Sequence, residues 1–202
     1  DSNMSVVRQR EDGSYYYSYH APLFTEINLS SLKSLGMEAF AHAQKLVKVT
    51  LGKDVKIVSQ RAFANCASLE EINLENVEII GTEAFSETSI KKINLASIKE
   101  IGKYAFSQCL KFENAIMPST MIKIGEGAFS DCINVARIEL ANVKEIGAFA
   151  FHYCCTVKNV TIPQSVEKIG ELAKLVKKIS PEIIPSSVDF FYIVKGKCLP
   201  FF

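Results

Sequence analysis

Cysteine and histidine are the side chains of this sequence with the most distinctive chemistry, either as nucleophiles or as metal ligands. The chain contains six cysteines and three histidines. His152, Cys154 and Cys155 lie close together, but a structural zinc site needs four converging ligands. The other histidines, His20 and His42, lie far away along the chain. We therefore expect no metal site.

Four of the cysteines share a spacing that favours a structural role. Each lies three residues after a phenylalanine, at a position that alanine or threonine fills elsewhere in the chain. Such a position indicates a small buried slot, in which free cysteine packs as an apolar residue. A disulfide between two members, such as Cys132 and Cys154, is the alternative. We expect Cys155 and Cys198, outside this column, to be exposed thiols. The four are Cys66, Cys109, Cys132 and Cys154.

Other motifs that could support chemistry are explained by a regular repeat. Gly125-Glu-Gly127 resembles part of a dinucleotide-binding loop, but the third glycine of that motif is missing. No serine, cysteine or carboxylate has a partner pattern that interrupts the repeat, as a nucleophilic or acid–base site would. The sequence thus predicts a non-catalytic protein without a cofactor.

The repeat that positions these side chains is 21–23 residues long. Its most regular part is Ile-Gly-x-x-Ala-Phe, as in Ile101-Gly102-Lys-Tyr-Ala105-Phe106. A decayed copy ends at Lys174. The copies before it end, at intervals of 23, 22, 21, 23 and 22 residues, at Phe40, Phe63, Phe85, Phe106, Phe129 and Phe151.

A short strand follows each of these segments. Apolar residues stand six, nine and eleven positions after the phenylalanine, as Leu69, Ile72 and Leu74 do. The last two alternate with a period of two, which is typical of a strand with one buried face. We expect a short helix or 3-10 turn around Ala-Phe on the opposite side. The glycine would serve a positive-φ turn or a close backbone approach. Stacking would place phenylalanine on phenylalanine and isoleucine on isoleucine.

Composition agrees with a folded repeat domain and argues against several other classes. Of the 202 residues, 48% are hydrophobic and 22% are charged, so a buried core is expected. A net charge of +1 gives no basis for binding nucleic acid or an anionic membrane. No apolar run approaches the roughly 20 residues that span a bilayer. The first residues, Asp1 to Ser5, do not resemble a signal peptide.

The consensus Ile-Gly-x-x-Ala-Phe-x-x-Cys-x-x-Leu-x-x-Ile-x-Leu-Pro-x-Ser-Val resembles the BspA-like class of leucine-rich repeats. The resemblance covers about residues 24–188, and Ile162-Pro163-Gln-Ser-Val166 is among its best matches. It implies a right-handed α/β solenoid of about seven repeats, in secreted or cell-surface proteins of bacteria and some protozoa, often linked to adhesion. Many leucine-rich repeats have a buried asparagine after the strand, whereas this chain has an apolar residue there, such as Val77.

We expect a single leucine-rich repeat domain over residues 1–202. Residues 26–174 would hold the regular repeats. Residues 1–25 would form an N-terminal cap or degenerate first repeat, with the tyrosines of 15–19 over the end of the array. Residues 175–202 would form a degenerate last repeat and a C-terminal cap, or else an exposed edge where the chain continues or binds a partner. We expect a monomer, with end-to-end association as the alternative.

The outward positions of the strands, here called the strand face, are the candidate binding surface. They are polar, of mixed sign and without an aromatic stripe, so they specify no sugar, lipid or nucleic acid. We expect a non-catalytic interaction or adhesion module that presents this face to a protein or extracellular-matrix partner. The alternatives are a merely solvated face and a structural spacer in a longer surface protein. The candidate residues are Lys48, Thr50, Glu71, Asn73, Lys92, Asn94, Arg137, Glu139, Asn159 and Thr161.

A second outward column directly precedes the isoleucine–glycine pairs of the repeats and alternates in sign. This alternation favours ion pairs between neighbouring repeats, each worth at most about 1 kcal/mol. The column consists of Glu100, Lys123, Glu145 and Lys168.

Overall fold

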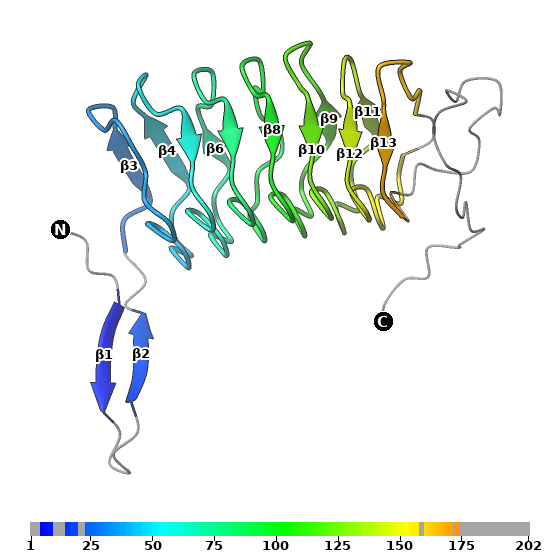
Figure 1. Cartoon of the computed structure of the whole chain (residues 1–202). Coiled ribbons are helices and arrows are strands. Elements are labelled where there is room, and N and C mark those ends of the chain that lie inside the picture. The colour runs from blue at the N-terminus through cyan, green and yellow to red at the C-terminus, as the bar shows by residue number, and fades with distance from the viewer. Residues whose placement is uncertain (1–4, 10–14, 20–22, 158–159, 172, 174–202) are drawn as a thin grey trace.

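Successive repeats stack in parallel as a solenoid in the computed structural model, which describes residues 5–9, 15–19, 23–157, 160–171 and 173 (Figure 1). The described array runs from β3 to β13, and each repeat lies directly beside the next. The decayed copy at Lys174 lies outside the described residues. About six turns of the predicted solenoid are therefore present in the structure.

The strands at the predicted positions, one before Phe40 and the others after a repeat phenylalanine, form parallel sheets on one side of the solenoid. Ile27 lies opposite Val49, and Val49 lies opposite Ile72, so equal positions of successive repeats meet in register. The predicted strands are confirmed in five repeats, but residues 92–95 and 160–162 are not in strands. The sheets are β3 (Glu26–Leu29), β4 (Lys48–Leu51) and β6 (Glu71–Ile72), and β9 (Asn114–Ile116) with β11 (Arg137–Glu139).

A further parallel sheet, here called the glycine-side sheet, forms at the two residues before the repeat glycines from Gly81 to Gly170, and before Ser59 at the equivalent position. It has six strands in the order β5-β7-β8-β10-β12-β13. The predicted cross-strand ion pairs of its outward column are confirmed at Glu145, which lies 3.4 Å from Lys123 and 3.1 Å from Lys168. Its strands are β5 (Ile57–Val58), β7 (Ile79–Ile80), β8 (Glu100–Ile101), β10 (Lys123–Ile124), β12 (Glu145–Ile146) and β13 (Lys168–Ile169).

Tight turns, and not helices, surround the Ala-Phe pairs in the part of the chain that the structure describes, so the prediction of helical or 3-10 turns was wrong. Positive φ occurs two residues before and after each phenylalanine, as at Tyr104 (φ 52°) and Gln108 (φ 57°). The amides of Tyr104 and Phe106 donate to the carbonyls of Glu126 and Ala128 in the next repeat, each at 2.8 Å. Amides used between repeats cannot form the i→i−4 bonds of a helix.

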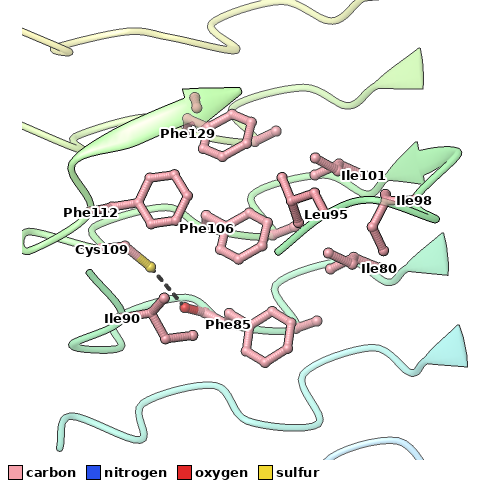
Figure 2. Close-up of a cluster of buried hydrophobic side chains, with 14 of the residues drawn as sticks. Ile80, Phe85, Ile90, Leu95, Ile98, Ile101, Phe106, Cys109, Phe112 and Phe129 are labelled. Atoms are coloured by element: carbon pink, nitrogen blue, oxygen red, sulfur yellow. Dashed lines mark hydrogen bonds between the residues drawn. The ribbon is translucent and has the colours of Figure 1, made fainter. Parts of the chain in front are cut away.

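The phenylalanines stack on one another through the core, which confirms the central prediction of the repeat spacing. Ring centroids are 5.6 Å apart for Phe63 and Phe85, 5.4 Å for Phe85 and Phe106, and 5.3 Å for Phe106 and Phe129. All four side chains are fully buried. Figure 2 shows Phe85, Phe106 and Phe129 in successive repeats, with Phe112 beside them.

The repeat glycines permit two backbones to approach closely. A Cβ atom on Gly102 would lie 2.6 Å from the carbonyl carbon of Gly81 and 2.7 Å from the amide nitrogen of Thr82. A Cβ on Gly36, in the first described repeat, would have no described heavy atom within 4 Å. Positive φ is found at Gly127, which belongs to a turn and not to this column. Of the two predicted roles, close approach is therefore the correct one.

The N-terminal segment forms a hairpin of its own. β1 (Ser5–Gln9) pairs antiparallel with β2 (Tyr15–Tyr19), and the pair lies apart from the array in Figure 1. Packing of the tyrosines over the first repeat stays a prediction, as do the domain boundaries. Residues 175–202, with the predicted last repeat and cap, lie outside the described residues. Within those described residues there is no helix long and apolar enough to cross a membrane.

Candidate functional site

The regularly spaced cysteines are free and buried, which confirms their structural interpretation and argues against a disulfide between Cys132 and Cys154. Each thiol donates to the carbonyl of the phenylalanine in the preceding repeat, as Cys109 does to Phe85 at 3.1 Å (Figure 2). Burial raises the pKa of the Cys109 thiol to about 11 and that of Cys66 to about 12. The thiolate that a nucleophile or metal ligand needs is therefore scarce at neutral pH.

Cys155 lies outside this column, but it is disulfide-bonded, so the expectation of a free thiol there was wrong. The residue is exposed, whereas the column cysteines are enclosed by the core, so Cys155 is accessible to another cysteine. Cys198 lies outside the described residues. Among the residues that are described, no group of three or more His, Cys, Asp and Glu side chains could hold a metal ion.

Ion pairs connect neighbouring repeats on the predicted strand face. Lys48 lies 3.1 Å from Glu71, and the hydrogen bond to that carboxylate raises the pKa of Lys48. Lys92 lies 3.6 Å from Glu113. Exposed pairs of this kind are weak, so these side chains remain available to a partner. Of the other predicted residues, Thr50 lies in β4, and Arg137 forms an ion pair with Glu139 within β11. Thr161 lies in segment 160–162, which is not a strand, and Asn159 is outside the described residues.

Two predicted binding residues use their side chains to hold backbone. Asn73 accepts a hydrogen bond from the amide of Leu51 (2.6 Å) and donates one to the carbonyl of the same residue (3.2 Å). Its side chain continues the pairing of β4 beyond the end of β6. Asn94 accepts a hydrogen bond from the amide of Ala96 (3.0 Å), two residues on in a local turn. The alternation of the strand pattern gave no indication of these roles.

The strand face contains a shallow hollow of about 350 Å³ near its C-terminal end. Arg137 and Glu139 of β11 line it, together with Thr161 and Pro163 of the next repeat. The structure thus brings three of the predicted binding residues together at one depression.

A larger groove, of about 840 Å³, runs along the glycine-side sheet from β7 to β13. Among the described residues, it is lined by none of the predicted strand-face positions. Its floor is formed by the backbone of the repeat glycines and of the isoleucines before them, and the side chains of Ile101 and Ile124 are buried in the core. One rim carries the outward column Glu100, Lys123, Glu145 and Lys168, and the opposite rim carries Thr82, Lys103, Glu126 and Ala148.

The rims of this groove carry both signs of charge in close pairs. Lys103 lies 3.0 Å from Glu126, which also accepts a hydrogen bond from the hydroxyl of Tyr104 (3.1 Å). Hydrogen bonds from Lys103 and Tyr104 lower the pKa of Glu126, and hydrogen bonds from its lysine neighbours lower the pKa of Glu145. The groove therefore presents ionised but locally balanced charge at neutral pH.

The backbone in the floor of the groove is already hydrogen-bonded. The amide of Gly102 donates to the carbonyl of Ile80 (2.7 Å), and the amide of Gly125 donates to that of Ile101 (2.8 Å). A ligand in the groove would therefore be held by side chains. The alternating charges could be found in the sequence, but the groove between the rims could be recognised only from the stacked backbone of the structure.

A family model described as the BspA type leucine rich repeat region matches residues 13–98 and 99–192, in six copies. The chain belongs to the BspA-type leucine-rich repeat family. Leucine-rich repeat domains generally mediate protein interactions, and the match indicates no enzyme family. No curated protein matches the sequence.

Solved structures of bacterial leucine-rich repeat proteins share this fold. A protein from Bacteroides ovatus is 29% identical, with a TM-score of 0.70, over 83% of this chain and 46% of its own. The T. pallidum protein TpLRR is 24% identical, with a TM-score of 0.69, over 85% of this chain and 84% of its own. A protein from Eubacterium ventriosum is 23% identical, with a TM-score of 0.71, over 93% and 55%. The chain thus spans about half the length of the first and third of these proteins.

Proposed function

We propose that this solenoid is a non-catalytic adhesion module, secreted or displayed on a cell surface, that binds a protein or extracellular-matrix partner. The groove of about 840 Å³ along the glycine-side sheet is the observation that carries the proposal. It crosses successive repeats, as the extended binding surfaces of solenoids do. Family membership supports the interaction role, and the surface location rests on the resemblance to BspA-like proteins.

The groove is the preferred contact surface, and the strand face is the second. The groove is the larger hollow and has charged rims on both sides, whereas the hollow at Arg137 is less than half its volume. A surface of this kind suits a partner that packs small groups on the glycine backbone of the floor and forms ion pairs with the rims. Contacts on the strand face would centre on the predicted residues Arg137, Glu139 and Thr161.

A binding measurement on purified protein distinguishes the two surfaces. The chain is immobilised and titrated with a panel of purified extracellular-matrix proteins. Charge reversal in the groove (Lys123→Glu with Lys168→Glu) should weaken binding, while reversal on the strand face (Lys92→Glu with Arg137→Glu) should leave it nearly unchanged. Equal melting temperatures would show that both variants are folded. Saturable binding that neither variant alters would refute both surfaces, and a panel without any binder would count against adhesion.

A structural spacer in a longer surface protein is the second candidate, and the first repeat favours it. Leu32 is 38% exposed, although Val55 and Val77 at the same position of the next repeats are 0% and 1% exposed. An apolar edge of this kind suits a junction with further structure. Deletion of this segment from the full-length protein should then leave ligand binding intact, whereas the adhesion proposal expects its loss.

A further inference from the structure

The chemistry of the groove restricts the kind of segment that can occupy it. Its floor amides are used between repeats, as Gly125 to Ile101 and Gly147 to Ile124 are, each at 2.8 Å. A partner strand therefore finds no unpaired edge to extend, which excludes strand addition here. Among the described residues that line the groove there is no aromatic side chain, the platform that polyproline segments and unstacked bases use.

The charge pattern restricts the occupant further. Along one rim Glu100 neighbours Lys123, Lys123 neighbours Glu145, and Glu145 neighbours Lys168, each on adjacent strands. A polyanion such as nucleic acid or a sulfated glycan would meet a carboxylate at every second repeat. The rim instead suits a partner with side chains of both signs.

The spacing of the repeats selects the backbone of that partner. Adjacent strands lie about 4.8 Å apart, so the column from Glu100 to Lys168 spans three steps, or roughly 14 Å. An α-helix along the groove presents one side chain per turn of about 5.4 Å, or roughly 16 Å over three turns. An extended strand presents one per about 6.8 Å on a face, or roughly 20 Å over three steps. Flexible lysine and glutamate side chains absorb the mismatch of about 2 Å but not that of about 6 Å.

We infer that the groove binds an amphipathic α-helix of a partner protein, which lies along the solenoid axis and carries charges of alternating sign once per turn. This inference rests on the proposed function and names its partner class. The helix places opposite charges against Glu100, Lys123, Glu145 and Lys168. Its side of small apolar residues faces the glycine backbone of the floor, because the isoleucine side chains next to the glycines are buried in the core or packed against it. The rim charges exchange intrachain pairs for intermolecular ones at little cost, because exposed pairs are weak.

Two stapled, alanine-rich helical peptides of equal composition test the inference. The alternating peptide carries Lys, Glu, Lys and Glu at i, i+4, i+7 and i+11, and the block peptide carries Lys, Lys, Glu and Glu at the same positions. Fluorescence anisotropy should show that the alternating peptide binds about tenfold more tightly, since two of four ion pairs become like-charge contacts with the block peptide. Neither peptide gains by reversing its direction, because the block pattern matches the rim in neither orientation.

The double variant Lys123→Glu with Glu145→Lys supplies the matched control. It keeps the net charge and the pair between positions 123 and 145 but converts the rim to a block pattern, so the preference between the peptides should invert. An unchanged preference, or no binding of either peptide, overturns the helix inference. If a matrix protein still binds the chain in that case, the proposed adhesion role stands without it.

Discussion

Truncation of a ring in the middle of the phenylalanine stack should cost more free energy of unfolding than truncation at its beginning. The Phe106 ring is fully buried and lies 5.4 Å, 5.5 Å and 5.3 Å from the rings of Phe85, Phe112 and Phe129. Burial sets the cost of Phe106→Ala at about 3–5 kcal/mol. Among the described residues Phe40 stacks on one ring, and each ring contact is worth about 0.5–1.5 kcal/mol. With two contacts fewer, Phe40→Ala should cost about 1–3 kcal/mol less.

Urea unfolding followed by circular dichroism measures this difference. Phe85→Ala, with ring contacts on both sides, should fall between the other two variants. The slope of the free energy against urea must be compared as well, because an array that loses its end repeat first exposes less surface in the main transition. Equal costs for Phe40→Ala and Phe106→Ala at equal slopes would refute stack position as the source of stability. The milder effect expected for Lys174→Phe concerns a position outside the described residues and stays a prediction.

Three further substitutions separate backbone from surface effects. Gly102→Ala should lower the free energy of unfolding by about 1–3 kcal/mol, because the added Cβ would meet the backbone of the preceding repeat. Gly36→Ala should be neutral or slightly stabilising, because a Cβ there meets no described atom. Thermal melts of both variants measure the difference, and equal losses of stability would contradict the close approach at Gly102. Asn73→Ala removes two hydrogen bonds to backbone and should cost about 1–2 kcal/mol in urea unfolding, more than Asn94→Ala with its single local bond. Hydrogen bonds and charge from the neighbouring lysines lower the pKa of Glu145 in the folded state below its usual 4.5. The ionised carboxylate therefore stabilises the fold fully above pH 4.5, and this stabilisation is lost as the pH falls through the folded pKa. Melting temperature should therefore fall on acidification, and less steeply in Glu145→Gln.

The core could be predicted from the sequence because stacking repeats the same contact in every turn. Phe63 meets Phe85 for the same reason that Phe106 meets Phe129, so a spacing visible in six copies fixes the contact without knowledge of the backbone path. The cysteine column followed in the same way, since a position shared with alanine and threonine must be small and enclosed. The disulfide bond of Cys155 could not be predicted in this way, because that residue lies outside the repeated position.

The turns and the glycine-side sheet could not be predicted from local patterns. Alanine and phenylalanine have no bias toward positive φ, and Glu83 and Tyr104 adopt it where Gly127 stands in another repeat. The hydrogen bonds to the next repeat impose that conformation, and they exist only after stacking. Strands of two residues, such as β8 and β10, are likewise too short to show a period of two. The groove was missed for this reason, since its floor and rims belong to those elements.

The alternating charges of the rim have two physical consequences that composition alone cannot separate. In a parallel, in-register stack, each residue meets its equivalent in the next repeat, so a column of one sign would repel itself at about 4.8 Å. Alternation removes that repulsion, as the pairs of Glu145 with Lys123 and Lys168 show. The same alternation makes the groove neutral overall and gives it a charge pattern along its length. If the rim charges only stabilise the fold, their effect depends on whether adjacent repeats carry opposite charges. If they also recognise a partner, their effect depends in addition on the order of the charges along the rim. Exchange of the charges at positions 123 and 145 keeps the ion pair between these two positions but changes the order of charges along the rim. A much larger effect of this exchange on binding than on folding would therefore show that the rim takes part in recognition.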